Sequence, residues 1–418
     1  MLNKEGQREL CYVVKINNIE PIVGSDNCEA AIVGGWKIMV RNNTFNIGDL
    51  AIYFEIDSQV PEIEVFKFLE KKHYKIKTQK YTFGGKNPGF YSQGLLMSAE
   101  DFGGICYQDG DGTMYLHFGK DSFFGINEDM PEGTFLTTRI GVKYAEPEDN
   151  KRKSSSSDKY KKMASRHPKL FKNPIIKKIY KNKIGKKILF FFFGNKKDEK
   201  SAFPYWVIKT DEERIQNLVE NIPDYRKEKW IATEKIDGTS TTFTIHRKKH
   251  NKYEYAVCGR NVRMTDRNDG SFYKENVYTE MAIKYNMENI LRDMLNRAYT
   301  CDYVTIQGET YGEKIQNRDY SIKGHDLAIF NIIFGTDSGK SIRLNPIKMK
   351  ELLDCYGLPT VPIVAEDIEL PETCDKILVM ASGESQIDGK PREGLVFRNY
   401  DATKSFKAVD NNFIIKYH

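Results

Sequence analysis

The sequence has few cysteines and no long hydrophobic run, and each absence excludes a class of protein. Seven cysteines are spread over 418 residues, and no two are spaced as Cys-x-x-Cys. This pattern argues against a zinc site and a disulfide framework, and it favours a reducing compartment. The most conspicuous apolar run, Ile188–Phe193, is too short to span a bilayer. The first ten residues lack an apolar signal-peptide core. We therefore expect an intracellular protein, cytoplasmic or nuclear, that is neither secreted nor membrane-bound.

Charge is unevenly distributed along a chain whose composition is typical of a folded protein. Hydrophobic residues make up 40% and aromatic residues 12%, and the length suits two or three domains. The net charge is +6, but residues 151–200 contain 18 Lys and Arg against three acidic residues. Such a run is either a solvated linker or a surface for polyanionic phosphate backbone, and the sequence leaves both open.

The first 145 residues are predicted to form short β-strands separated by glycine-rich turns. This spacing favours a small OB-like β-barrel. The predicted strands are Leu10–Ile16, Ala30–Val33, Trp36–Val40 and Leu50–Ile56. Farther along, aromatic and basic residues interleave as at a nucleic-acid surface, and we select Tyr74, Lys75, Lys77 and Lys80. Ordinary barrel packing with the lysines outward is the alternative.

Residues 206–418 are predicted to be a mixed α and β domain, separated from the barrel by a basic linker or insertion at 146–205. The fold class is therefore α+β. The strands expected here are Tyr255–Val257, Tyr303–Ile306, Leu327–Ile333, Leu395–Phe397 and Phe413–Ile415. The helices expected here follow a capping box at Thr210–Glu213, cover Glu275–Arg297, and run from Asn345 to Gly357.

The string Ala-Thr-Glu-Lys-Ile-Asp-Gly-Thr-Ser (232–240) places Lys235 two residues before an aspartate–glycine pair. A lysine amine in this position can attack the α-phosphate of a nucleotide and form a covalent lysyl-nucleotide. The amine needs neighbouring cations or a metal to favour its neutral form. The pattern is short, and an exposed hairpin turn at Asp237-Gly238 is the alternative.

Five further residues follow Lys235 in an order that suits adenylyl transfer. Arg260 and Lys407 can meet phosphate, where fixed positive charge stabilises a transition state. Glu309 can accept hydrogen bonds from ribose hydroxyls, and Phe330 can stack on a base. Glu393 offers hard oxygen to Mg²⁺ or Mn²⁺. Each residue alone has a purely structural explanation, and this alternative is strongest for Phe330, which can be an ordinary core residue. All five residues in this order nevertheless predict a nucleotidyl-transfer site.

These strings resemble the covalent nucleotidyltransferase superfamily of polynucleotide ligases and mRNA capping enzymes. The match is closest to ATP-dependent RNA ligases that carry an N-terminal OB-like domain. The resemblance covers residues 1–145 and about 212–418, while 146–205 looks like an insertion. The further strings that carry it are Gly48-Asp49-Leu50, Tyr53–Asp57, Ser92–Leu95 and Arg214–Leu218.

The resemblance implies an ATP-grasp-like adenylyltransferase domain of antiparallel sheets and flanking helices, which uses ATP with Mg²⁺ or Mn²⁺. ATP would adenylylate Lys235, AMP would pass to a 5′-phosphate end, and a 3′-hydroxyl would expel AMP. At the matching positions, Glu309 would lie at the ribose, Phe330 against the adenine and Glu393 at the metal. Arg260 and Lys407 would contact phosphate.

The residues that flank the nucleophile, and the last motif, carry further expectations. Glu234, Asp237 and Gly238 surround Lys235, and Glu234 is expected to read the adenine edge. Some of these ligases carry Lys-x-Lys in the last motif, whereas position 405 is serine here. Lys404 is a candidate substitute, so the sequence leaves open which lysine besides Lys407 contacts phosphate.

The implied partner is RNA, as a nicked duplex or as paired broken ends, with an RNA/DNA hybrid as a further candidate. We expect a monomer, with an end-healing kinase or phosphatase acting in trans. Deleting 151–200 is expected to weaken RNA affinity and its salt dependence while sparing lysine adenylylation.

Two other functions remain as alternatives. A GTP-dependent capping-type guanylyltransferase is disfavoured because only eleven residues follow Lys407, too few for the OB domain that those enzymes carry there. A non-catalytic RNA-binding protein is disfavoured because Lys235, Glu309, Glu393 and Lys407 are all present.

Overall fold

The computed structural model describes residues 1, 8–83, 89–145, 176, 189, 203–209, 211–265 and 276–417. The chain forms two compact units. One comprises Met1–Ala145 with Pro204–His418, and the other comprises Glu146–Phe203. The basic run at 151–200 and the expectation attached to it therefore lie almost wholly outside the described residues.

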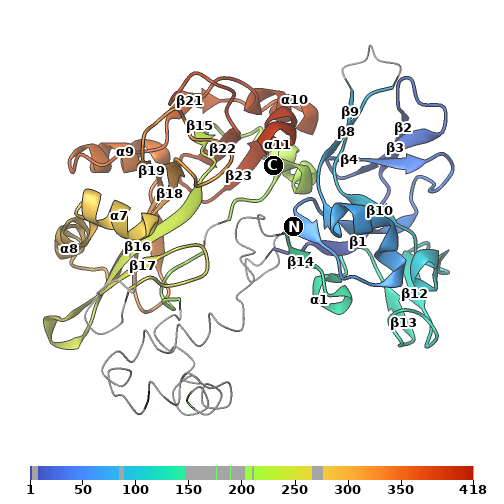
Figure 1. Cartoon of the computed structure of the whole chain (residues 1–418), viewed down its shortest axis with the longest axis horizontal. Coiled ribbons are helices and arrows are strands. Elements are labelled where there is room, and N and C mark those ends of the chain that lie inside the picture. The colour runs from blue at the N-terminus through green and yellow to red at the C-terminus, as the bar shows by residue number, and fades with distance from the viewer. Residues whose placement is uncertain are drawn as a thin grey trace. The chain divides into compact units, whose positions relative to one another are not determined.

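The N-terminal part is built from short antiparallel strands, as the sequence predicts (Figure 1). Its central strand, β5 (Leu50–Phe54), is apolar throughout and buried along its whole length. It pairs on one side with β1 (Cys11–Lys15) and on the other with β10 (Leu95–Met97). Beside these, β3 (Cys28–Val33) pairs with β2 (Asn18–Pro21) and β4 (Trp36–Arg41).

Smaller sheets and short helices complete this part. Their strands are β6 (Ser58–Gln59), β7 (Lys75–Ile76), β8 (Gln79–Tyr81), β9 (Phe90–Ser92), β11 (Gly104–Gln108), β12 (Met114–Phe118), β13 (Glu128–Met130) and β14 (Lys143–Tyr144). Their helices are η1 (Glu64–Lys72), η2 (Glu100–Phe102) and α1 (Thr137–Ile140).

The C-terminal part contains two antiparallel sheets. The four-stranded sheet has the order β21 (Ile363–Ile368), β15 (Trp230–Lys235), β22 (Gly394–Asn399) and β23 (Ser405–Val409). The five-stranded sheet has the order β17 (Tyr253–Cys258), β16 (Thr239–Arg247), β18 (Tyr303–Gly312), β19 (His325–Gly335) and β20 (Ser341–Arg343). Consecutive strands β15 and β16 belong to different sheets, so the short turn between them joins the two.

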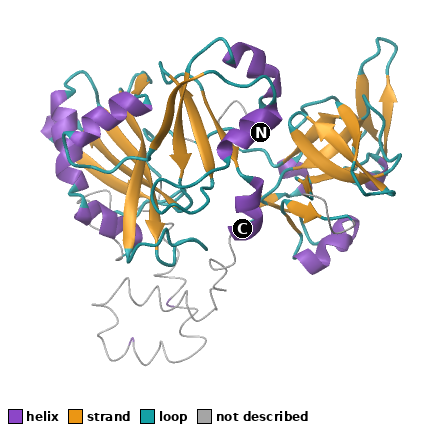
Figure 2. Cartoon of the chain, turned by 90° about the horizontal axis from the view of Figure 1, so that it is seen from above, coloured by secondary structure: helices purple, strands orange, loops and turns teal. Residues whose placement is uncertain are grey.

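Helices cover both sheets (Figure 2). The five-stranded sheet packs against α7 (Val277–Lys284), α8 (Met287–Arg297) and α9 (Pro346–Asp354). In α8, buried Met287, Leu291, Met294 and Leu295 recur at helical spacing, so one face of the helix enters the core. The four-stranded sheet packs against α10 (Cys374–Ala381). No helix among the described residues is long and apolar enough to cross a membrane.

The α+β class and the OB-like N-terminal part are confirmed, but three predictions within the second part are wrong. The helix expected over Glu275–Arg297 is two helices, α7 and α8, because Asn286 adopts a left-handed conformation with φ 48° between them. Residues Phe413–Ile415, expected as a strand, lie in α11 (Asn411–Tyr417). The Asp410 carboxylate accepts a hydrogen bond from the Asn412 amide there, which favours a helix start.

The third wrong prediction is the capping box at Thr210–Glu213, of which Thr210 lies outside the described residues. The segment leads into 3₁₀ turns, η5 (Ile215–Asn217) and η6 (Val219–Asn221), and then the one-turn α6 (Ile222–Tyr225). The Glu213 carboxylate accepts from the Arg214 amide and from the Asn217 side chain. The two acidic side chains before it, Asp211 and Glu212, bind partners elsewhere in the fold, and this competes with helix capping.

Candidate active site

Lys235 is the last residue of β15, at the point where the two sheets join. Across the sheet it pairs with Gly394 of β22. A Cβ on Gly394 would lie 2.2 Å from the Ala408 carbonyl oxygen, so glycine is needed for β22 and β23 to approach this closely. Glu393 precedes Gly394, and its carboxylate lies 2.7 Å from the Lys235 Nζ. The nucleophile candidate and the metal-ligand candidate thus form an ion pair.

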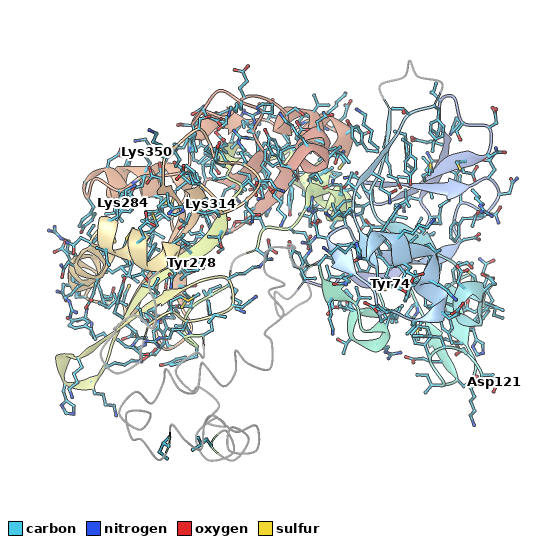
Figure 3. All side chains as sticks on the ribbon, in the orientation of Figure 1. Tyr74, Asp121, Tyr278, Lys284, Lys314 and Lys350 are labelled. Atoms are coloured by element: carbon cyan, nitrogen blue, oxygen red, sulfur yellow. The ribbon has the colours of Figure 1, made fainter. Side chains whose placement is uncertain are left out.

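The turn after Lys235 is buried, which excludes the exposed hairpin considered for Asp237-Gly238. Asp237 is 5% exposed, and its amide donates to the Tyr320 hydroxyl at 2.7 Å. A Cβ on Gly238 would lie 2.3 Å from the Thr310 carbonyl oxygen, so the turn presses against the strand that carries Glu309. Farther along β16, the Thr239 hydroxyl lies 2.9 Å from the hydroxyl of Tyr278, which is labelled on α7 in Figure 3.

Three carboxylates set the charge state of Lys235. Burial lowers the pKa of the Lys235 amine, but the negative charges of Glu393 and Glu309 outweigh burial and raise it above its usual value. Burial raises the pKa of Glu309 to about 8; Lys235 opposes this rise, while Glu393 and Asp237 add to it. In this state Lys235 is therefore an ammonium, and it must lose a proton before it can attack phosphorus.

Phe330 owes its position to a β-bulge. On β18 and β19, Gln307 pairs with Asn331 and Gly308 pairs with Ile329, so Phe330 has no direct partner across the ladder. Bulges of this kind redirect a side chain out of the regular alternation. Phe330 is partly exposed and partly packed against the core of the five-stranded sheet, which leaves a ring face for a base. Arg398 holds the bulge through a hydrogen bond to the Phe330 carbonyl.

The two predicted phosphate-binding cations meet at one carboxylate, that of Asp211. The Lys407 Nζ lies 2.8 Å from its Oδ1, and Arg260 lies 3.4 Å from its Oδ2. Lys404 lies elsewhere, where it forms an ion pair with Glu228 and approaches the ring of Tyr225. The structure therefore groups Arg260 with Lys407 and separates Lys404 from them.

Sequence reasoning missed a buried ionic cluster centred on Glu212. This carboxylate accepts hydrogen bonds from Arg343, Arg398 and Ser405, which belong to β20, β22 and β23. Burial would raise the pKa of Glu212, but the charges of the two arginines lower it to about 2. The cluster ties the two sheets together behind Phe330. Its only sequence signal is the acidic run at 211–213, which was interpreted as a helix cap.

Glu234 is buried beside the nucleophile. It is 1% exposed, and its Oε2 accepts from the Gln386 amide at 2.8 Å. Among the described residues, its Oε1 makes no hydrogen bond of normal geometry, although the Ser385 hydroxyl lies near the carboxylate and acts to lower its pKa. Burial raises the pKa of this carboxyl. A buried oxygen without a partner is costly, and an amino group of a bound base would satisfy it.

The four nucleic-acid candidates in the N-terminal part differ in exposure. Tyr74, labelled in Figure 3, is partly buried against the core of that part, and Lys75 is 7% exposed. Lys77 and Lys80 are exposed, and the Lys80 ammonium lies 5.1 Å from the centre of the Tyr91 ring. Exposure therefore favours Lys77 and Lys80 for contact with a polyanion.

Comparison with known proteins identifies the family. Residues 228–418 match the RNA ligase family, and residues 10–97 match an OB-fold domain family. A structure of Naegleria gruberi RNA ligase with pyrophosphate is 25% identical, with a TM-score of 0.68, and the match covers 98% of this chain and 99% of that chain. Residues 228–418 therefore belong to the RNA ligase family, and the whole chain aligns with a solved RNA ligase.

Structures of two Naegleria gruberi RNA ligase variants agree with this assignment. One variant, with ATP and manganese, is 26% identical with a TM-score of 0.65, and another, with AMP and manganese, is 25% identical with a TM-score of 0.66. Each match covers 98% of this ligase and 99% of its relative. The predicted group, ATP-dependent RNA ligases with an N-terminal OB domain, is confirmed. No curated protein matches the sequence of this chain.

Proposed function

We propose that this RNA ligase adenylylates Lys235 with ATP and then joins a 3′-hydroxyl RNA end to a 5′-phosphate end. The observation that carries the proposal is the position of the Lys235 Nζ, where the two sheets join, 2.7 Å from Glu393 and under the influence of Glu309. The relatives solved with ATP or AMP and manganese support ATP and a divalent metal as cofactors.

In the first step the Lys235 ammonium loses a proton to solvent, and the lone pair of the resulting amine forms a bond to the α-phosphorus as a second proton leaves the nitrogen for solvent. The bond from that phosphorus to the bridging oxygen breaks, and pyrophosphate leaves with the electron pair. Arg260 and Lys407 stabilise the charge that develops on the phosphates. Glu309 orients the ribose, Phe330 stacks on the adenine, and Glu234 accepts a hydrogen bond from the adenine amino group.

Glu393 is the proposed metal ligand. Among the described residues, no group of three or more His, Cys, Asp or Glu side chains is arranged to hold a metal ion. Mg²⁺ in nucleotide sites is typically held by one or two carboxylates together with phosphates and water, so Glu393 fits this donor set. The metal would neutralise charge on the triphosphate. A cation bound at Glu393 would offset the negative charge by which this carboxylate raises the pKa of Lys235.

In the later steps AMP passes from Lys235 to the 5′-phosphate, and the 3′-hydroxyl attacks the activated end and expels AMP. We assign residues 1–145 and the basic segment 146–205 to RNA binding and residues 206–418 to nucleotidyl transfer. The proposed substrate is a nicked duplex RNA, with a separate enzyme supplying the 5′-phosphate.

Incubation of the pure ligase with Mg²⁺ and α-labelled ATP or GTP tests the first step. We expect covalent label from ATP alone, no label on Lys235→Ala, and full label on Lys404→Ala, whose ammonium is paired with Glu228. Label from GTP alone would establish the guanylyltransferase alternative. The labelled ligase should then seal a nicked RNA duplex that carries a 5′-phosphate and leave one with a 5′-hydroxyl unsealed.

A further inference from the structure

The short segment 211–214, which precedes η5, contacts both the catalytic part and the OB part through successive residues. Asp211 binds Lys407 and Arg260, and Glu212 binds the buried arginine cluster. The Glu213 carbonyl accepts from the Lys407 amide at 2.7 Å, so the segment lies against β23. The Arg214 guanidinium donates to Asp57 at 3.2 Å. The backbone that follows Asp211 is thus fixed, and the Asp211 side chain is held near Lys407.

The geometry around Asp211 resembles that of a bound anion. Each carboxylate oxygen faces one cation, at 2.8 Å for Lys407 and 3.4 Å for Arg260. Burial would raise the pKa of Asp211, but Lys407, together with the nearby charges of Arg8 and Arg260, lowers it well below its usual value. Asp211 is therefore ionised throughout the working pH range and occupies the cations that adenylyl transfer needs for phosphate.

The exposures of the three side chains allow this contact to be exchanged. The Lys407 side chain is 11% exposed, so it is held in place by its surroundings. The side chains of Asp211 and Arg260 are 32% and 55% exposed, so Asp211 can turn toward water while Arg260 stays over the Tyr144 ring, 5.0 Å from its centre. An ion pair that is partly open to solvent is also weak enough for a multiply charged phosphate to replace it.

We propose that Asp211 is a built-in competitor of the phosphates at Lys407 and Arg260. This inference rests on the proposed function. In the free ligase the carboxylate neutralises both cations, the triphosphate of ATP displaces it, and it returns as pyrophosphate leaves. Because the competitor is part of the chain, the apparent affinity for any phosphate ligand is reduced by the fraction of ligase in which the cations are free. Asp211 thereby promotes pyrophosphate release and opposes the reversal of adenylylation.

Asp211→Asn tests the proposal, since it removes the charge and keeps the shape. We expect pyrophosphate to bind the variant about fivefold or more tightly, as measured by calorimetry, because coupled sites typically interact on that scale. The pyrophosphorolysis of preformed lysyl-AMP should accelerate at low pyrophosphate, and the KM for ATP should fall. Glu220→Gln is the matched control: it removes one negative charge from an exposed position in η6 and should change none of these values.

The opposite result has a distinct meaning. If Asp211 serves to position Lys407 for phosphate, the Asp211→Asn variant will bind pyrophosphate more weakly than wild type. Unchanged pyrophosphate binding would also overturn the proposal that Asp211 competes with phosphate. If Asp211→Asn does not fold, Arg260→Gln provides the second measurement. This change removes one cation that Asp211 and phosphate share. It is measured in the wild-type background and in an Asp211→Ser background. Competition predicts that Arg260→Gln lowers pyrophosphate affinity less in the wild-type background, because Asp211 already occupies the cation there. A wild-type ligase that forms no lysyl-AMP would instead refute the proposed function, whereas pyrophosphate affinity can be measured independently of that step.

Discussion

Charged side chains serve different purposes in the two parts of this ligase. In the catalytic part, the charged residues of the motifs are largely buried and face one another, as Lys235 does with Glu393 and Lys407 does with Asp211. In the OB part, the predicted nucleic-acid contacts Lys77 and Lys80 are exposed. Buried charges cost several kcal/mol each unless they are paired, and removing one partner is correspondingly damaging. Exposed charges act on a polyanion almost independently, so each loss should be small.

The largest expected effect is that of Glu393→Gln. Because Glu393 is the proposed metal ligand, its loss should slow lysine adenylylation by about 10²–10³-fold, the range typical when one electrostatic contribution to a transition state is removed. The same change should lower the pKa of Lys235, because Glu393 is the main carboxylate that raises it. The pH profile of Lys235 modification by an amine reagent would show this as a shift to lower pH.

The opposite directions of these two readouts distinguish catalysis from damage to the fold. Glu384→Gln is a suitable control because Glu384 is exposed on the loop that leads to β22. A Glu393→Gln variant with unchanged Lys235 reactivity would contradict the ion pair seen here.

Phe330→Ala should weaken ATP binding by roughly tenfold, since stacking of a base on an aromatic ring contributes about 1–3 kcal/mol. The measurement is the ATP concentration dependence of lysyl-AMP formation. Phe334 lies on the same strand and is also partly packed on the core. Phe334→Ala should therefore reduce stability and leave the KM for ATP unchanged. Equal effects of both changes on KM would show that Phe330 is simply core.

Glu309→Gln is expected to stabilise the free ligase. The folded-state pKa of Glu309, about 8, lies above the usual value of 4.5, so the folded ligase retains a proton that the unfolded chain has lost. Stability therefore falls as pH rises from about 4.5 to 8, and Gln abolishes this loss. Without nucleotide or metal, the Tm of the variant should match wild type near pH 4.5 and exceed it by roughly 2–6 °C at pH 8.

The matched control for this measurement is again Glu220→Gln, which should show no pH-dependent difference in Tm. The higher Tm of Glu309→Gln at pH 8 should be accompanied by loss of ligation, because Glu309 is proposed to hold the ribose. Wild type that is equally stable at pH 8 would mean that Glu309 is ionised without cost in the free ligase.

Residues that belong to an ordered motif could be predicted from the sequence, whereas residues that act through partners distant in the sequence could not. Lys235, Glu309 and Glu393 were predicted because nucleotidyl transfer needs these residue types in one order along the chain. Asp211 and Glu212 were missed because their roles depend on partners about 50 to 200 residues away, which no local pattern shows. Asp211–Glu213 satisfies a capping pattern, but tertiary ion pairs override that local preference.

The smallest expected effects belong to the OB part. Lys77→Ala and Lys80→Ala should each weaken RNA binding a few-fold and reduce the slope of log affinity against log salt by about one, without changing lysyl-AMP formation. Lys75→Ala should act differently, because Lys75 is 7% exposed, and its loss should lower stability more than RNA affinity. Lys71→Ala, at an exposed position in η1, controls for general charge. If Lys71→Ala reduced the salt slope as much as Lys80→Ala, RNA would be responding to the charge of the whole part, and no particular surface of the OB domain would be its binding site.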